Sequence, residues 1–298
     1  MNSVPDAFLD AVCSHLNFCH LKDRLKRIQG GWSVKAAIHK SKRRELMVVV
    51  DHGRNEVKFG FANMQTFRYA SPTLNAKYDR IRLIEVGIFA TDELPESTSM
   101  ECFKKKVLPV LRSLAFDCIL RFASNKSFPE NMTHIIFDSL HGCTQLTSVC
   151  TRNYGGNCPD FIKHQISLGC LKELDLRGDG DWPADLQDAL RLFVNSPRFV
   201  KLVCGSNLTV DIYMVIAFVE RFLRGDFSRI TELQGTTREL RGKPSFPVTW
   251  LHELHRDKQR LYYQKPKSAN VRWTRSRREH LVASRNNGGD LCLNLYLL

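Results

Sequence analysis

The sequence contains no apolar run close to the roughly 18 consecutive residues that a membrane-spanning helix needs. Charged and histidine side chains interrupt the apolar positions near the N-terminus, so we expect no secretory signal peptide there. Charged residues make up 25% of the chain and apolar residues 43%, the usual shares for a folded globular protein. These features predict a protein of the cytosol or nucleus that makes no contact with a membrane.

The ten cysteines include no C-x-x-C pair, so the most specific zinc-binding and thiol-redox motifs are absent. Most cysteines stand beside apolar residues, as Cys118 does in FDCIL, and we expect small buried side chains in a reducing compartment. Phosphate-binding loops, dinucleotide-binding loops and the nucleophile elbow of hydrolases are also missing. The sequence therefore predicts no metal, no cofactor and no catalytic residues, and we expect that the protein is not an enzyme.

Acidic residues are scarce in two stretches of the chain. Residues 236–285 hold 13 Lys and Arg against 4 Asp and Glu, and residues 20–45 hold 9 against 2. The whole chain carries a formal charge of +13, so the remainder is slightly acidic. Two basic zones around a near-neutral middle predict an acidic partner.

The first 45 residues predict a helical segment of three short helices. The first covers Pro5–Leu16, with proline in the favoured first turn, and the second has apolar residues at helical spacing between residues 21 and 28. Gly30-Gly31 separates it from a third helix that begins near Trp32. Residues 46–80 then predict a β-hairpin and linker, because LMVVVD and VKFGF flank a turn around Gly53.

From residue 81 to residue 240 a pattern of apolar-x-x-apolar-x-(apolar or small) recurs six times. The copies are Ile81/Ile84/Val86, Met132/Ile135/Phe137, Leu146/Val149/Thr151, Leu171/Leu174/Leu176, Phe199/Leu202/Cys204 and Ile230/Leu233/Gly235. The last four copies lie 25, 28 and 31 residues apart, close to the roughly 20–29 residues of leucine-rich repeats. The sequence therefore predicts an irregular α/β solenoid of the leucine-rich-repeat kind, in which each strand–helix unit covers the next.

Helices are expected between the later copies of this pattern. Residues 182–197 predict one with Pro183 in its first turn, and residues 210–225 predict another that begins at Asp211 and ends at Gly225. Before the regular copies we expect a long helix over residues 101–124, interrupted by Pro109. Residues 241–298 predict a basic C-terminal cap, with a helix over 249–263 and a final hairpin that turns at 286–289.

The N-terminal helices resemble an F-box, which opens on an apolar residue and proline and places a tryptophan four residues after an apolar position. The positions that match are Val4, Pro5, Phe8, Leu9, Val12, Leu16, Leu21, Leu25, Ile28 and Trp32. The layout is also similar to the expanded, divergent F-box-like families of nematodes, which pair a Ser-Val-Pro opening with a later W-P…L…L…F…S-P-x-F block. This chain has Ser3-Val4-Pro5 and, for the block, Trp182-Pro183, Leu186, Leu190, Phe193, Ser196-Pro197 and Phe199.

This resemblance implies that the ten N-terminal positions bind a Skp1-like adaptor. It also implies that the protein is a substrate receptor of an SCF-type ubiquitin ligase, with a solenoid that binds the protein target. A three-helix segment of this length buries its own apolar face poorly, and a partner that covers it gains about 25 cal/mol per Å². The alternative is that these helices pack on the N-terminal edge of the solenoid as a cap.

In a leucine-rich repeat, the residues between the apolar strand positions line the concave face, which is a candidate surface for the protein target. Here these residues are Glu85, His134, Asp138, Arg152, Glu173, Asp175, Lys201, Val203, Glu232 and Gln234. The alternative is an ordinary solvated sheet face.

The basic C-terminal zone could contact nucleic acid through phosphate contacts and ring stacking. The candidate residues are Lys265, Lys267, Arg272, Trp273, Arg275, Arg277 and Arg278. A nuclear import patch and a solvated basic face are the other interpretations of this zone. The leading hypothesis is thus a ubiquitin-ligase adaptor, and its rival is a protein- or nucleic-acid-binding module unrelated to ubiquitination.

Overall fold

A computed structural model of the chain divides into two compact units, residues 1–118 and 119–298, and each is described by itself. Strand β5 (Ala115–Phe122) contains the boundary. The described residues are 4–16, 21, 28, 30–53, 56–69, 73–87, 94–123, 128–227, 231–236 and, without their side chains, 271–276, 279–285 and 291–297.

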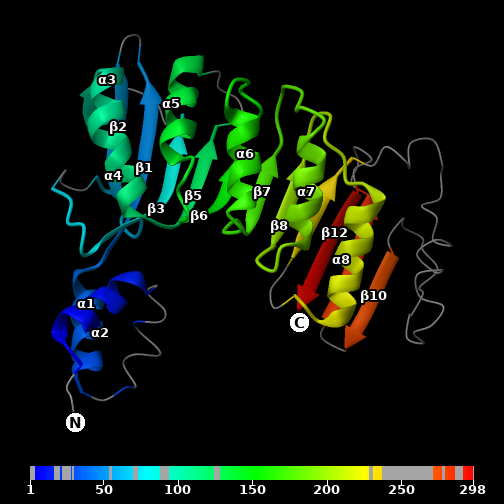
Figure 1. Cartoon of the computed structure of the whole chain (residues 1–298), viewed down its shortest axis with the longest axis horizontal. Helices are drawn as coiled ribbons and strands as arrows, with labels where there is room; N and C mark the ends of the chain where they lie inside the picture. The colour runs from blue at the N-terminus through cyan, green and yellow to red at the C-terminus, as the bar shows by residue number, and fades with distance from the viewer. Residues whose placement is uncertain are drawn as a thin grey trace. The chain divides into compact units, whose positions relative to one another are not determined.

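The first unit combines a helix pair with a small sheet (Figure 1). Its elements are α1 (Asp6–His15), α2 (Gly31–Lys42), β1 (Arg44–His52), β2 (Val57–Asn63), β3 (Asp79–Val86), β4 (Glu96–Thr98), α3 (Met100–Cys102), the π-helical turn η4 (Phe103–Val107) and α4 (Leu108–Leu114). Strand β1 pairs antiparallel with β2 and parallel with β3, and β2 pairs antiparallel with β4.

The expected hairpin of residues 46–61 is confirmed by the pairing of β1 with β2. Its β1 strand reads LMVVV, and these five side chains are all buried. Such a continuous apolar run is typical of a strand that is covered on both faces. On one of these faces Met47 and Val49 form a cluster with Ala62 and Leu94.

The expected helix over residues 101–124 is wrong in its second half. Helix α4 ends at Leu114, and Ala115 begins strand β5. Pro109 does not interrupt the helix but follows a π-helical turn, in which the Leu108 N–H donates to the Phe103 carbonyl. A proline lacks the N–H that an α-helix needs, and Pro109 stands at the start of α4, where that loss is tolerated.

The second unit alternates helices and strands before it ends in three antiparallel strands. Its elements after β5 are α5 (Glu130–Leu140), β6 (Leu146–Cys150), α6 (Cys158–Ser167), β7 (Glu173–Leu176), α7 (Leu186–Asn195), β8 (Lys201–Cys204), α8 (Ile212–Arg224), β9 (Glu232–Gly235), β10 (Val271–Ser276), β11 (Glu279–Arg285) and β12 (Leu291–Leu297).

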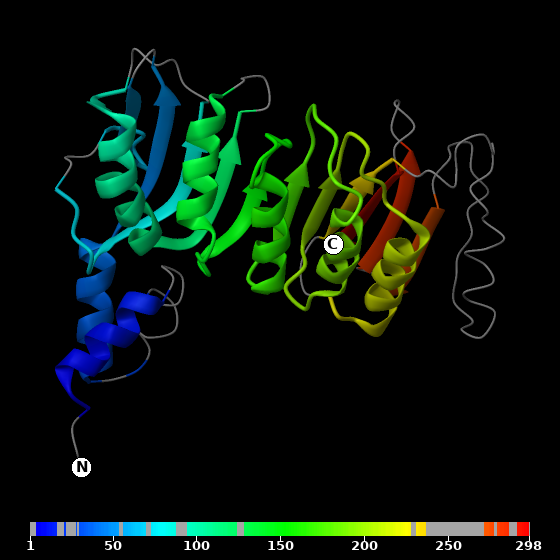
Figure 2. The same ribbon diagram turned by 45° about the horizontal axis from the view of Figure 1, so that its top comes forward.

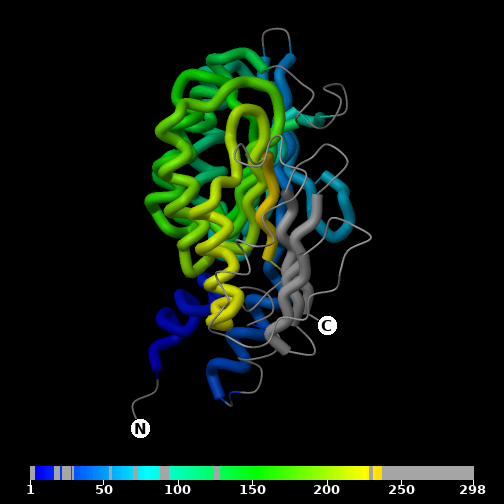
Figure 3. Tube along the Cα trace, turned by 90° about the vertical axis from the view of Figure 1, so that its right-hand side faces the viewer, coloured from blue at the N-terminus to red at the C-terminus, as the bar shows by residue number. Residues whose placement is uncertain are grey.

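Strands β6 to β9 are parallel and lie in sequence order, and helices α5 to α8 cover one of their faces (Figures 1 and 3). The helices stand side by side in a row (Figure 2). Val149, Leu174, Leu202 and Leu233 share one register across the four strands and are fully buried. Burying each such side chain contributes about 1.5–3 kcal/mol, so this apolar row carries much of the stability of the unit.

Helix α8 has the ends that the sequence predicts. The Asp211 carboxylate accepts a hydrogen bond from the Met214 N–H over 3.0 Å, and Gly225 closes the helix with a φ of 85°. Helix α7 begins later than expected, because Pro183 belongs to the preceding turn, where its carbonyl accepts from the N–H of Leu186.

The copy of the repeat pattern at Met132/Ile135/Phe137 is not a strand. These residues belong to helix α5, whose buried positions include Met132, Ile136, Phe137 and Leu140. An apolar-x-x-apolar-x-apolar pattern over six residues fits one turn of a helix as well as a strand, and here the helical spacing continues to Leu140. His134 and Asp138, expected on the sheet, therefore lie on this helix.

The final hairpin is confirmed by the antiparallel pairing of β11 with β12. Strand β12 also pairs antiparallel with β9, and β10 adds a strand that the sequence analysis did not foresee. The expected helices over residues 21–28 and 249–263 lie largely or wholly outside the described residues. The chain is thus of the mixed α/β class, as predicted, and no helix among the described residues is long and apolar enough to cross a membrane.

Candidate functional site on the N-terminal helices

Helices α1 and α2 pack against each other through a small apolar seam. Cys13 of α1, Ala36 of α2 and Leu21 between them are buried, and Leu16 packs beside them. Leu9 is also buried, and its Cδ1 lies only 3.0 Å from the position of a Cβ added at Gly31. Glycine at this position therefore lets the two helices approach closely.

Other apolar side chains of the same helix pair remain in contact with solvent. Phe8 is 54% exposed and Val34 is 59% exposed, large values for such residues. The Phe8 ring meets the half-buried Trp32 ring edge to face, with centroids 6.2 Å apart. Together these residues form the N-terminal apolar set, whose members are Val4, Phe8, Ile28, Trp32 and Val34. Exposed apolar side chains mark a candidate interaction site, and Phe8 with its contact to Trp32 is the centre of this one.

A charged cluster holds α1 in place beside this set. The Asp10 carboxylate lies 3.4 Å from Lys35 Nζ, 2.9 Å from Lys77 Nζ and 3.1 Å from His39 Nε2. The hydrogen bond from Lys77, with help from His39 and Lys35, lowers the pKa of Asp10 to about 2. Asp10 therefore stays ionised at neutral pH, and it links α1 to α2 and to the turn before β3.

His39 is the buried member of this cluster. Its side chain is fully buried, and burial lowers the pKa of the imidazole below its usual value. A neutral ring facing an ionised carboxylate must donate from Nε2 to Asp10, which leaves Nδ1 as a buried nitrogen without a hydrogen-bond partner. The ring also packs edge to face on Tyr78, with centroids 5.2 Å apart.

Two buried arginines bind the C-terminal end of α1 to the sheet of the first unit. Arg43 donates to the carbonyls of Cys13, over 2.8 Å, and Leu16. Arg80, at the start of β3, donates to the Ser14 carbonyl over 2.9 Å. The last carbonyls of a helix lack partners within the helix, so these arginines satisfy them and fix the helix pair on β1 and β3.

The ten residues expected to bind an adaptor divide into three groups by exposure. Val4, Pro5, Phe8 and Ile28 are exposed, while Val12, Leu16 and Trp32 are half-buried. Leu9 and Leu21 are buried in the seam and stabilise the helix pair from inside, and Leu25 lies outside the described residues. Sequence reasoning missed Val34, because it lies two residues from Trp32 and therefore on another side of the helix than the F-box-like positions.

The residues expected to contact a protein target lie mostly on β7, β8 and β9. In register, Glu173 pairs with Lys201 and Lys201 with Glu232, and Lys201 Nζ lies 2.8 Å from the Glu232 carboxylate. On the next row of the same face, Asp175 accepts hydrogen bonds from Arg177 over 2.6 and 2.9 Å. This part of the sheet face is therefore polar and its charges are largely paired within the chain.

The other members of the expected target surface differ in exposure and position. Val203 on β8 and Glu85 on β3 are buried, whereas Gln234 on β9 is half-buried. Arg152 follows β6, with its guanidinium 4.9 Å from the centroid of the Tyr154 ring. His134 and Asp138, on α5, are not part of the sheet face.

Only some of the candidate nucleic-acid-binding residues belong to the described part of the chain. Arg272, Trp273 and Arg275 belong to strand β10, of which only the backbone is described. Lys265, Lys267, Arg277 and Arg278 lie outside the described residues.

The described cysteines match the expectation of small buried side chains in most cases. Cys13, Cys118, Cys143, Cys158 and Cys204 are buried, the other three described cysteines are half-buried, and none of these eight forms a disulfide. Burial raises the pKa of Cys158 to about 11 and that of Cys204 to about 12, so neither is a reactive thiolate. Within the described ranges, no three His, Cys, Asp or Glu side chains come together as a metal site would require.

No family model matches the chain, and no curated protein matches its sequence.

Proposed function

We propose that this protein is a non-catalytic adaptor, in which the N-terminal helix pair binds a Skp1-like subunit and the second unit binds a protein target for an SCF-type ubiquitin ligase. Such a protein accelerates a reaction only by holding two partners close together, so it needs two binding surfaces and no catalytic residues. The observation that carries the proposal is the exposure of Phe8 and its edge-to-face contact with Trp32.

The N-terminal apolar set has the chemistry of a docking surface. Aromatic residues dominate the binding energy of protein interfaces, and truncation of one at the centre costs about 2 kcal/mol or more. Contacts of Asp10, Arg43 and Arg80 attach the helix pair that carries Phe8 to the rest of the first unit. Binding of a partner therefore requires little ordering of the chain. A rigid docking element suits an adaptor, because a fixed position is what it contributes.

The second unit supports the other half of the proposal. Its parallel strands β6–β9 follow one another in sequence order, and each is joined to the next by a helix on the same face. In this order each strand–helix unit contacts its neighbours, as in leucine-rich repeats, and the strand face opposite the helices carries half-buried polar side chains such as Glu173 and Lys201. We interpret this body as the target-binding part of the adaptor.

The competing interpretation treats the N-terminal helices only as a cap. A cap buries its apolar residues against its own chain, as Leu9 and Leu21 are buried here, and leaves the exposure of Phe8 and Val34 without a purpose. Docking of a partner explains both groups, because the buried residues stabilise the pair and the exposed residues meet the partner. The exposure therefore favours docking over capping.

The experiment is a binding assay with the full chain and a purified Skp1-like subunit. The variants are Phe8→Asp and Val34→Asp, which alter exposed side chains, and the matched control is Leu192→Asp, at a 71% exposed position on α7. We expect the wild type and the control to bind equally, and Phe8→Asp to lose affinity by roughly thirtyfold or more. Failure of the wild type to bind, or equal binding of all variants, would contradict the adaptor proposal.

A further inference from the structure

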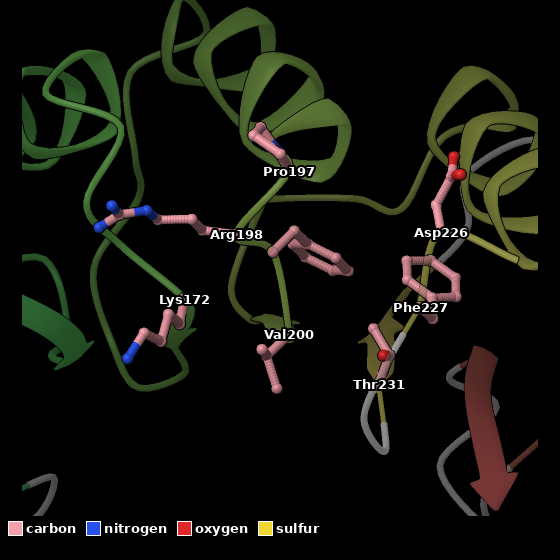
Figure 4. A pocket seen from close by; sticks show the side chains of 8 residues that line it. Lys172, Pro197, Arg198, Val200, Asp226, Phe227 and Thr231 are labelled. Atoms are coloured by element: carbon pink, nitrogen blue, oxygen red, sulfur yellow. The ribbon is translucent and has the colours of Figure 1, made fainter. Parts of the chain in front are cut away.

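A pocket of about 210 Å³ lies in the second unit. It opens where α7 and α8 end and where β8 and β9 begin (Figure 4). The residues that line it are Lys172, Pro197, Arg198, Phe199, Val200, Asp226, Phe227 and Thr231. The sequence marks Pro197 and Phe199 but not the pocket, because its lining comes from three separate turns.

We propose that this pocket binds an aromatic or large aliphatic side chain that stands next to a carboxylate, as in a short acidic segment of a protein target. The inference rests on the proposed function, because it names the chemistry of the target that the second unit would hold. It commits to an anionic ligand and not to a neutral or cationic one.

Two aromatic rings form part of the wall of the pocket, and both are supported by the core of the second unit. Phe199 and Phe227 are 3% and 6% exposed, and both contact the buried ring of Phe218, with centroids 6.0 and 5.0 Å away. Pro197 and Val200 add apolar surface beside Phe199. A cavity of about 150 Å³ is known to hold benzene, so this volume suits one aromatic ring or a leucine side chain.

The charges around the pocket favour an anion. Lys172 and Arg198 lie on one side of it, and Asp226 lies on the other (Figure 4). Asp226 is already paired, because its carboxylate lies 2.9 Å from Arg224 Nε. Arg198 is exposed and forms no ion pair with any residue in the described part of the chain. The site therefore has one exposed cation, Arg198, that a ligand carboxylate could meet.

A third cation, Arg221, packs against both aromatic rings that line the pocket. Arg221 is 4% exposed, and its guanidinium lies 4.8 Å from the centroid of the Phe227 ring and 5.9 Å from that of Phe199. It donates to the Val194 carbonyl near the end of α7, so the negative end of that helix is already neutralised. Arg221 therefore offsets the partial negative charge that the end of α7 would otherwise present to an anionic ligand.

The test uses three small probes of similar size on the full chain. Phenylacetate carries a ring and a carboxylate, benzyl alcohol a ring and no charge, and phenethylamine a ring and an ammonium group. Binding is measured by ligand-observed NMR titration at low salt. We expect phenylacetate to bind at least threefold more tightly than benzyl alcohol, and phenethylamine to bind most weakly.

Two variants and one control locate the binding. Arg198→Gln removes an exposed charge that the fold does not need, and should weaken phenylacetate by about twofold to fivefold while leaving benzyl alcohol unchanged. Val200→Phe fills the pocket and should weaken both probes, whereas Arg112→Gln, at an exposed position of α4, should change neither.

Several outcomes would overturn the inference. They are no binding of any probe, equal affinity for the three probes, or phenylacetate binding that Arg198→Gln leaves unchanged. Because no Skp1-like subunit is present in this assay, failure of the pocket and failure of adaptor docking give separate results.

Discussion

The position of α1 depends on a few charged side chains that are wholly or partly buried. The Asp10 carboxylate contacts Lys35, Lys77 and His39. Arg43 and Arg80 donate hydrogen bonds to carbonyls at the C-terminal end of the helix. Partly buried groups of this kind titrate away from their usual pH, so the attachment of the helix depends on pH in a way that can be measured.

The first prediction concerns Asp10. Its pKa is about 2 in the folded protein, well below the ordinary value of an aspartate, so the ionised carboxylate stabilises the fold at neutral pH. This contribution is present above pH 4 and is lost as the pH falls toward 2. Asp10→Asn should therefore unfold at lower temperature than the wild type at pH 7, and the gap should close between pH 4 and pH 2.

Thermal unfolding followed by circular dichroism measures this gap. Asp6→Asn is the matched control, because Asp6 pairs with the same Lys35 over 3.1 Å but its side chain is largely exposed. A constant gap between Asp10→Asn and the wild type across this pH range would contradict the proposed role of Asp10.

The second prediction concerns His39. Burial lowers the pKa of the imidazole. A proton added at the buried Nδ1 would find no hydrogen-bond acceptor among the described residues. The unfolded chain therefore binds a proton more readily than the folded one, and stability decreases as the pH falls below about 6.5. His39→Gln keeps a donor for Asp10 but cannot titrate, so this part of the pH dependence should disappear.

The direct measurement is an NMR titration of the His39 ring. Asp10, Lys35, Lys77 and Arg43 are the charged groups around it, and Asp10 alone favours the protonated ring. We expect a midpoint below that of an exposed histidine in the same protein. A midpoint above 6.5 would mean that the Asp10 carboxylate outweighs burial, contrary to the account given above.

At the scale of single elements, the ends of the helices in the second unit determine where the chain turns toward the next strand. Gly225 ends α8 with a φ of 85°, a conformation in which a side chain is strained. Gly225→Ala should destabilise the protein by about 1–2 kcal/mol, and Gly225→Asn by less, because asparagine adopts this conformation more readily. Urea unfolding measures both values, and equal stability of the two variants would show that the helix ends by another device.

Elements also divide by how well the sequence predicts them. The β1–β2 hairpin, the final hairpin and helix α8 follow from local signals: apolar strands around a turn, or a helix with Asp211 and Gly225 at its ends. Helix α5 was mistaken for a strand because six residues of its apolar pattern fit either period. Strand β5 was hidden in an expected helix because the two elements follow each other without a turn signal at Leu114.

The candidate sites were predictable to different degrees. Phe8 and Trp32 stand out in the sequence because their spacing resembles an F-box, whereas Val34 and the arginines that fix α1 emerge only from tertiary contacts. The pocket of the second unit could not be foreseen, since Phe199 and Phe227 are ordinary core residues in the sequence and meet only when α7 and α8 end at the same edge.

At the scale of the whole molecule, the chain combines a basic helix-bearing unit with a mixed α/β unit. Residues 1–118 carry 19 Lys and Arg against 13 Asp and Glu, so an acidic partner would be attracted to this unit before it docks. Phe8 and its neighbours would then be covered, and the second unit would remain free for a target. The central claim is therefore that a Skp1-like subunit covers α1 and α2 and leaves the second unit uncovered.

Hydrogen–deuterium exchange of the full chain, with and without a Skp1-like subunit, tests this claim most directly. We predict slower exchange in peptides that cover α1 and α2, no change in β6–β9, and loss of the protection in Phe8→Asp but not in Leu192→Asp. Unchanged exchange in α1 and α2, or protection confined to the second unit, would contradict the account.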